Sequence, residues 1–170
     1  MKFDVIQGDI AEQSADALVN AAGTSLEMGS GVAGALRRRG GDALNEEAVE
    51  NGPVDLGEVA VTDAHDLDAE YVIHAAAMPH YGDGQATEGS IRDATQNALE
   101  AADELDCESI VVPALGCGVA GFDTDEGAAI IGEEIESYDP AVLEEVRVIA
   151  YSDEEYDAIR AATGKVADSE

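Results

Sequence analysis

Two glycine-rich segments carry the clearest chemical signal in the chain. The first spans residues 29–34 and the second residues 116–121, and both match the pattern Gly-x-Gly-x-x-Gly. Each stands just before a predicted helix. Glycines let the backbone approach an anion closely with its N–H groups turned inward, and the following helix adds the positive end of its dipole. Both segments are therefore predicted to be loops that bind phosphate groups through backbone amides.

Better-known phosphate sites do not fit these loops. The sequence has no Gly-x-x-x-x-Gly-Lys-Ser/Thr loop for a nucleoside triphosphate. A Cys-x5-Arg phosphatase loop is excluded because Asp123 stands six residues after Cys117. A dehydrogenase needs its glycines directly after a strand, with an acid about twenty residues later that closes a second strand. The first loop fails this test because Glu50 lies in a predicted helix, and the strand after the second loop ends only near Ser152.

Alternating strands and helices must position the two loops. The predicted strands are residues 2–7, 17–20, 57–62, 71–77, 109–115 and 145–151. The predicted helices are residues 32–39, 42–50, 87–105, 123–138 and 153–162. This alternation indicates a largely parallel sheet covered on both faces. One domain over residues 1–162 is expected, followed by a polar tail over residues 163–170.

The charge of the chain is extreme. Thirty-eight acidic residues against eight lysines and arginines give a formal net charge of −30. A small domain ordinarily carries a net charge of about 2–8, and the Debye length at 1 M salt is only about 3 Å. The composition therefore predicts a halophilic organism. Nucleic-acid binding is disfavoured because the one basic cluster, residues 37–39, suits the end of a predicted helix.

The sequence also indicates where the protein works and which sites it lacks. No stretch approaches about 18 consecutive apolar residues, and the start of the chain is charged, so neither a membrane span nor a secretion signal is expected. A cytoplasmic protein is predicted. Cys107 and Cys117 have neither disulfide-framework nor zinc-ligand spacing, so free thiols and no metal site are expected.

Six short blocks occur in an order that resembles the macrodomain family over roughly residues 1–160. They are residues 7–10 (QGDI), 16–22 (DALVNAA), 29–33 (GSGVA), 72–74 (VIH), 109–115 (SIVVPAL) and 116–122 (GCGVAGF). The resemblance implies a three-layer α/β/α sandwich with a mixed, largely parallel sheet. It also implies a cleft at one end of the strands that binds ADP-ribose or ADP-ribosylated protein, with no separate cofactor.

The resemblance implies roles for residues at the base-binding end of the cleft. Asp9 matches the acid that accepts a hydrogen bond from the adenine amino group, and Ile10 matches the residue whose backbone amide meets the base. Tyr151 matches an aromatic residue that packs on adenine. The local sequence leaves other roles open, because Asp9 could cap a short helix near residues 10–14 and Tyr151 could pack in the core.

The two glycine loops correspond to the diphosphate and ribose loops of the family. The residues concerned are Ser30, Gly31, Val32, Ala33, Gly116, Cys117, Gly118, Val119 and Ala120. Asn20 lies in a Val-Asn-Ala-Ala motif beside the cleft, and both a structural hydrogen bond and a ligand contact remain open for it.

Departures from the family pattern bear on catalysis. Members that hydrolyse ADP-ribosyl bonds often have an asparagine where this chain has Gly23, and one branch has an aspartate where it has Ala33. Glycine and alanine can neither orient the distal ribose nor activate water. A further branch uses a lysine, for which the chain offers only Lys2 and Lys165, near its termini.

The predicted function is therefore binding of ADP-ribose, with two alternatives. The first is hydrolysis of an ADP-ribose ester, either O-acetyl-ADP-ribose or a mono-ADP-ribosyl protein, and the second is NAD-dependent oxidoreduction. His80, in the loop after residues 71–77, is a catalytic candidate, although a solvated loop histidine is the alternative. Cys117 is a candidate reactive thiol, because helix-end amides could lower its pKa, or a small packing residue. His74, in mid-strand, is expected to be buried and hydrogen-bonded.

Overall fold

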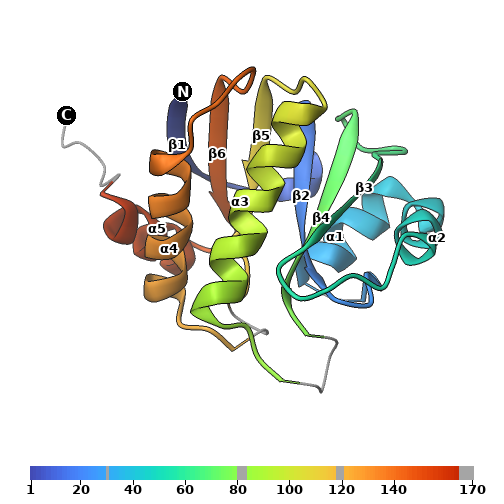
Figure 1. Ribbon diagram of the computed structural model, residues 1–170, viewed down its shortest axis with the longest axis horizontal. Helices are drawn as coiled ribbons and strands as arrows, with labels where there is room; N and C mark the ends of the chain where they lie inside the picture. Colours follow the sequence, from blue (N-terminus) through green and yellow to red (C-terminus); the bar gives the residue numbers. More distant parts are fainter. Residues whose placement is uncertain (30, 80–83, 118–120, 165–170) are drawn as a thin grey trace.

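A mixed, largely parallel sheet forms the centre of the molecule (Figure 1). The computed structural model describes residues 1–29, 31–79, 84–117 and 121–164. Within these residues six strands pair in the order β1-β6-β5-β2-β4-β3. The strands are β1 (Lys2–Gln7), β2 (Ala17–Gly23), β3 (Val59–Asp63), β4 (Tyr71–Met78), β5 (Ser109–Val112) and β6 (Glu145–Ala150). All of these pairings are parallel except that of β3 with β4.

Helices cover both faces of the sheet and complete the expected three layers. They are η1 (Ile10–Glu12), α1 (Gly31–Gly40), α2 (Asp42–Glu50), α3 (Glu88–Glu104), α4 (Thr124–Ser137) and α5 (Asp153–Thr163). Side chains of α3, α4 and α5 pack in one hydrophobic cluster with the sheet, and those of η1, α1 and α2 pack in a second. Figure 1 shows α3 and α4 on one face of the sheet and α1 on the opposite face.

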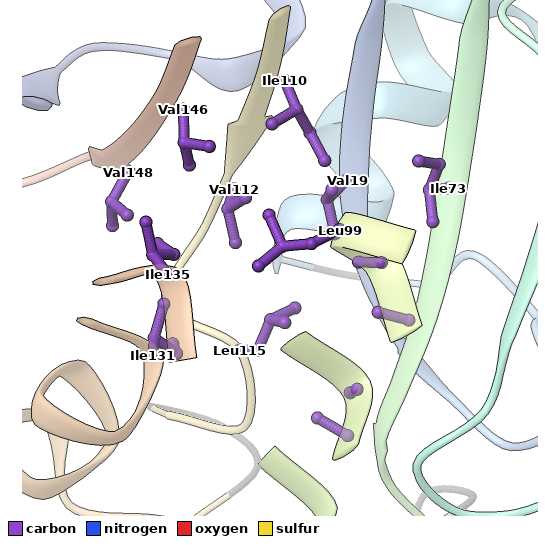
Figure 2. Packing of buried hydrophobic residues seen from close by; sticks show 14 of the residues in the cluster. Val19, Ile73, Leu99, Ile110, Val112, Leu115, Ile131, Ile135, Val146 and Val148 are labelled. Carbon is purple, nitrogen blue, oxygen red and sulfur yellow. The ribbon is translucent and has the colours of Figure 1, made fainter. Parts of the chain in front are cut away.

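The strands contribute side chains to both clusters, because successive side chains of a strand point to opposite faces of the sheet. In β2, Leu18 enters the cluster under α1 while Val19 enters the one under α3. Figure 2 shows strand residues such as Val112 and Val148 directed toward Leu99 of α3 and Ile135 of α4. Full burial of one such side chain stabilises the fold by about 1.5–3 kcal/mol.

The boundaries of the elements agree with the sequence where local signals are strong. Thr87 caps α3 in a reciprocal pair with Ser90, and Asp123 caps α4 through the backbone N–H of Glu126. The predicted end of the strand over residues 109–115 is wrong, because the observed strand β5 ends at Val112. Pro113 has no N–H to donate to the ladder.

The end of the chain differs slightly from expectation. Helix α5 runs to Thr163 and ends at Gly164, whose φ is 74°. Glycine adopts this left-handed conformation readily, which suits the end of a helix. The polar tail was predicted to begin at residue 163, and its residues 165–170 lie outside the described residues.

Candidate functional site

A cleft of about 440 Å³ opens at the carboxyl ends of the parallel strands. Its walls come from the segments that follow β1, β5 and β6, from the ends of β2 and β4, and from the first turns of α1. These strand ends meet at one edge of the sheet, where ligands of α/β proteins characteristically bind. The cleft brings together residues as far apart in the sequence as Gly8 and Glu155, as expected for this location.

The segment after β1 presents Asp9 at the cleft. Oδ1 of Asp9 accepts a hydrogen bond from the backbone N–H of Ala11 at 2.9 Å and so caps η1. This confirms the capping role that the local sequence left open. The cap occupies one carboxylate oxygen, so Asp9 can line the cleft at the same time. Further along, Arg147 donates to the carbonyl of Ser14 at 2.8 Å and holds the segment against β6.

The second glycine loop, residues 116–121, is packed closely where it leaves β5. Gly116 is buried with φ 77°, and a Cβ there would lie 2.7 Å from Cγ1 of Ile91 and 2.8 Å from Cβ of Ala86. The position therefore admits glycine alone without rearrangement. Phe122 donates its backbone N–H to the carbonyl of Gly116 at 3.1 Å, which closes the loop on itself.

Cys117 does not have the reactive thiol that helix-end amides could have produced. Burial raises the pKa of Cys117 to about 12, and the carboxylates of Glu155 and Asp123 act in the same direction. Of the two alternatives for Cys117, the reactive thiol with a lowered pKa is therefore wrong and the packing role is confirmed. The side chain fills a space against α4, where a Cβ at Gly127 would collide with its sulfur. Cys117 is a packing residue that also lines the cleft.

The first glycine loop, residues 29–34, continues into α1 at Gly31, and the residue before it, Met28, makes polar contacts with α1 and α2. The backbone N–H of Met28 donates to Oδ1 of Asn45 at 2.9 Å, and its carbonyl accepts from Nη1 of Arg37 at 3.2 Å. Gly31 and Val32 line the cleft. Ala33 instead lies in the hydrophobic cluster beneath α1 and is 1% exposed.

Asn20 serves the structural role that the sequence left open. Its Nδ2 donates to Nδ1 of His74 at 3.0 Å, and Nε2 of His74 lies 3.0 Å from Oγ1 of Thr62. The Thr62 hydroxyl donates in turn to the carbonyl of Asp63, which requires the proton of the His74 ring to be on Nε2. Burial lowers the pKa of His74 to about 4, against a smaller opposing effect of Glu47. His74 is thus buried, neutral and hydrogen-bonded, as predicted.

Tyr151 is the most exposed large apolar side chain in the described part of the chain. It is 77% exposed and lines the cleft, which excludes the alternative that it packs in the core. Its backbone N–H donates to Oε1 of Glu155 at 2.9 Å, and Ser152 caps the N-terminus of α5 beside it. The backbone that carries the ring is therefore fixed at the cleft wall, and the exposed ring is accessible to a flat ligand group.

The sequence did not indicate several of the residues that line the cleft. They are Gly8, Ala21, Ala22, Ala35, Arg38, Met78, Pro113, Ala114, Ile149 and Glu155. Among the described lining residues, Asp9 and Glu155 are acids and Arg38 is the one base. The signal for Arg38 was its spacing, because Val32, Ala35 and Arg38 recur every three residues and share a helix face.

Some predictions fall outside the described residues or concern absences. His80, Ser30, Gly118, Val119 and Ala120 are not among the described residues. Within the described ranges, no group of three or more His, Cys, Asp or Glu residues could hold a metal ion. No helix in that part of the chain is long and apolar enough to cross a membrane.

Comparison with known proteins places these features in a family. The family model described as Macro domain matches residues 19–131. An uncharacterized protein of Sulfolobus acidocaldarius is 42% identical over 159 residues, which cover 90% of this chain and 85% of that protein. An uncharacterized protein of Saccharolobus solfataricus is 41% identical over 165 residues, 94% of this chain and 91% of that protein.

Solved structures agree with the sequence matches. A variant of the Oceanobacillus iheyensis macrodomain with ADPR has a TM-score of 0.85 and 26% identity, covering 95% of this chain and 91% of that chain. The Trypanosoma brucei macrodomain in complex with ADP-ribose has a TM-score of 0.85 and 25% identity, covering 95% and 69%. The mixed sheet, the cleft at its carboxyl edge and these matches lead to one conclusion: the chain belongs to the macrodomain family.

Proposed function

We propose that this chain binds ADP-ribose, free or attached to another molecule, in the cleft. The observation that carries the proposal is the convergence of both glycine loops on one cleft that also presents Asp9 and Tyr151. The first segment runs into the first turn of α1 and the second loop precedes α4, so backbone amides and helix dipoles favour an anion there. The similar Oceanobacillus iheyensis and Trypanosoma brucei macrodomains were crystallised with ADPR and ADP-ribose respectively.

The order of the strands supports a ligand with a base at one end and a sugar at the other. Along the carboxyl edge, β1 and β6 are followed by β5 and then β2. Neighbouring strands lie about 4.8 Å apart, so β1 and β2 are separated by roughly 15 Å. A base beside β1 and β6, a diphosphate beside β5 and a second ribose near the end of β2 would follow this edge in order.

Individual roles follow from this placement. The carboxylate of Asp9 accepts a hydrogen bond from the adenine amino group, the backbone of Ile10 meets the base, and the exposed ring of Tyr151 stacks on it. Asn20 supports the floor of the cleft through His74. The glycine loops hold the diphosphate and the distal ribose. Among the described residues that line the cleft, the loops contribute Gly31, Val32, Gly116 and Cys117. The family resemblance implies further contacts from Ser30, Ala33, Gly118, Val119 and Ala120.

The described cleft wall favours binding over hydrolysis. Its carboxylates, Asp9 and Glu155, belong to the segments after β1 and β6, which is the base end of the proposed ligand. The thiol of Cys117 stays protonated at neutral pH. Gly23 and Ala33 offer no group that could move a proton. Hydrolysis of an ADP-ribose ester would then depend on water oriented by the diphosphate itself or on residues outside the described ranges, such as His80.

The net charge supports a proposal about the working environment. We infer that the protein works in the cytoplasm of a cell with concentrated salt, because a charge of −30 requires screening. The melting temperature should rise as salt is raised from millimolar to molar concentration. An unchanged melting temperature over this range would contradict the inference.

Calorimetry in concentrated salt tests the binding function. ADP-ribose, ADP, adenosine and intact NAD are titrated into the protein, and O-acetyl-ADP-ribose and mono-ADP-ribosylated protein are assayed for turnover. Saturable binding of ADP-ribose without turnover is the expected result. Sustained hydrolysis would establish the enzymatic alternative, and preferred binding of NAD would point to oxidoreduction. Failure of every nucleotide to bind would overturn the proposal.

A further inference from the structure

The cleft poses an electrostatic problem for a diphosphate ligand. The chain carries a net charge of −30, and the described lining residues include two carboxylates, Asp9 and Glu155. A negatively charged ligand is therefore repelled by the protein as a whole and by these two groups. Arg38 is the single cationic side chain among the described residues that line the cleft.

Arg38 has no partner within the described residues that would neutralise it. Its neighbour Arg37 is occupied, with Nε 3.0 Å from Oδ1 of Asp42 and Nη1 donating to the carbonyl of Met28. Arg38 makes neither a hydrogen bond nor an ion pair with any described residue, although Asp9 lines the same cleft. Its guanidinium donors are therefore available to a ligand.

The guanidinium of Arg38 lies back along α1, toward the first glycine loop. Side chains on a helix lean toward its N-terminus, so Arg38 covers the position one turn earlier. That position is Gly34, where a Cβ would lie 3.3 Å from Nη1 of Arg38 and 3.3 Å from the carbonyl oxygen of Gly29. The missing side chain at Gly34 thus gives the cation room beside the loop. Val32 and Ala35 occupy the same wall of the cleft.

We propose that Arg38 is a specificity-determining residue that selects ligands bearing a diphosphate over uncharged nucleosides. This inference rests on the proposed function of the cleft. The guanidinium fork donates to phosphate oxygens and adds a full positive charge to the partial charges of the backbone amides. Because Arg38 is exposed, the contribution falls as salt screens it.

Arg39 offers a matched control. It is the next residue on α1, carries the same charge and is also exposed. Arg39 does not line the cleft; it lines an adjoining hollow that it shares with Arg38, Asp9 and Asp66. R38Q and R39Q therefore remove equal charge from nearly the same place. Only the first removes it from the cleft wall.

The test is calorimetric titration of the wild type, R38Q, R38K and R39Q with ADP-ribose, ADP and adenosine at two salt concentrations. R38Q should weaken the binding of ADP-ribose and ADP by about tenfold at the lower salt, as expected for loss of a hydrogen bond to a charged group. Adenosine affinity should stay unchanged, R38K should lose less, and R39Q should change affinity by less than about twofold. Thermal melting checks that each variant is folded.

Several results would overturn the inference. Equal losses for adenosine and ADP would mean that Arg38 contacts the base, and equal losses in R38Q and R39Q would mean that overall charge alone matters. Unchanged ADP affinity in R38Q would remove any role for Arg38. If the wild type bound ADP but not ADP-ribose, the proposed function would fail. The loss of ADP affinity relative to adenosine affinity in R38Q would still test the role of Arg38. If the wild type bound neither, both proposals would fall.

Discussion

The two glycine loops share one sequence pattern, yet the structure supports them differently. The second loop follows β5 directly, and Gly116 is buried against Ile91 and Ala86. The first loop is separated from β2 by residues 24–28 and depends on two hydrogen bonds at Met28, which donates its N–H to Asn45 and accepts from Arg37 at its carbonyl. Close packing holds one loop and polar contacts hold the other. The same motif can therefore be damaged in two distinct ways.

The largest effect is expected at the packed loop. Gly116→Ala should lower the free energy of unfolding by about 2–5 kcal/mol, because the new Cβ is overpacked and the backbone is left-handed. Gly164→Ala is the control, since Gly164 has a similar φ of 74° but nothing within 4 Å. It should cost only about 1–2 kcal/mol. Denaturant unfolding measures the free energy of unfolding of both variants. Equal losses of stability would show that close packing at Gly116 adds nothing to the cost of its left-handed backbone.

A second test addresses the strand that leads to the first loop. His74, which is hydrogen-bonded to Asn20 of β2, has a pKa lowered from 6.5 to about 4 by burial. The unfolded chain therefore binds a proton that the native state excludes, and stability falls as pH drops from 6.5 toward 4. The loss amounts to roughly 3 kcal/mol over this window.

Unfolding in concentrated salt at several pH values measures this loss while screening the acidic residues. His74→Gln should flatten the slope, whatever its effect on stability at neutral pH. A variant that kept the wild-type slope would show that other groups cause the acid sensitivity.

A smaller loss of stability is expected from the polar contacts of the first loop. Asn45→Ala removes the acceptor for the N–H of Met28 and should cost about 1 kcal/mol of stability. It should also weaken ADP-ribose binding by about threefold to tenfold, because the loop loses its position. Asn51→Ala is the control, since Asn51 bonds the carbonyl of Glu47 at the far end of α2. Comparable weakening of binding in both variants would contradict local support of the loop.

The smallest effect on stability is expected at Tyr151, which lines the cleft but belongs to neither loop. Tyr151→Ala should change the free energy of unfolding by less than about 0.5 kcal/mol, because the side chain is 77% exposed. ADP-ribose affinity should nevertheless fall by about tenfold through loss of stacking. Tyr151→Phe keeps the ring and should bind nearly as the wild type does. Equal affinity in Tyr151→Ala would exclude stacking by this residue.

Much of the fold was predictable because its signals are local. The apolar run of β4 and the caps of α3 and α4 identify those elements without knowledge of the rest of the chain. The site was less predictable because its chemistry depends on distant contacts. The pKa of Cys117 depends on burial and on Glu155, a residue of α5 that the sequence did not connect with the second loop. From the sequence, Arg38 was interpreted only as a basic residue at the end of a helix. That it lines the cleft depends on how α1 packs on the sheet, which no local pattern indicates.

The position of β1 at the edge of the sheet has a consequence for synthesis of the protein. In the described sheet β1 pairs with β6 alone, and Lys2 lies opposite Glu145. Because β1 precedes β6 in the sequence, β1 must remain unpaired on the ribosome until β6 has emerged. Asp9 and Tyr151 come to line the same cleft only after that pairing. A nascent chain should thus acquire ligand affinity late and abruptly, when β1 pairs with β6 and completes the cleft.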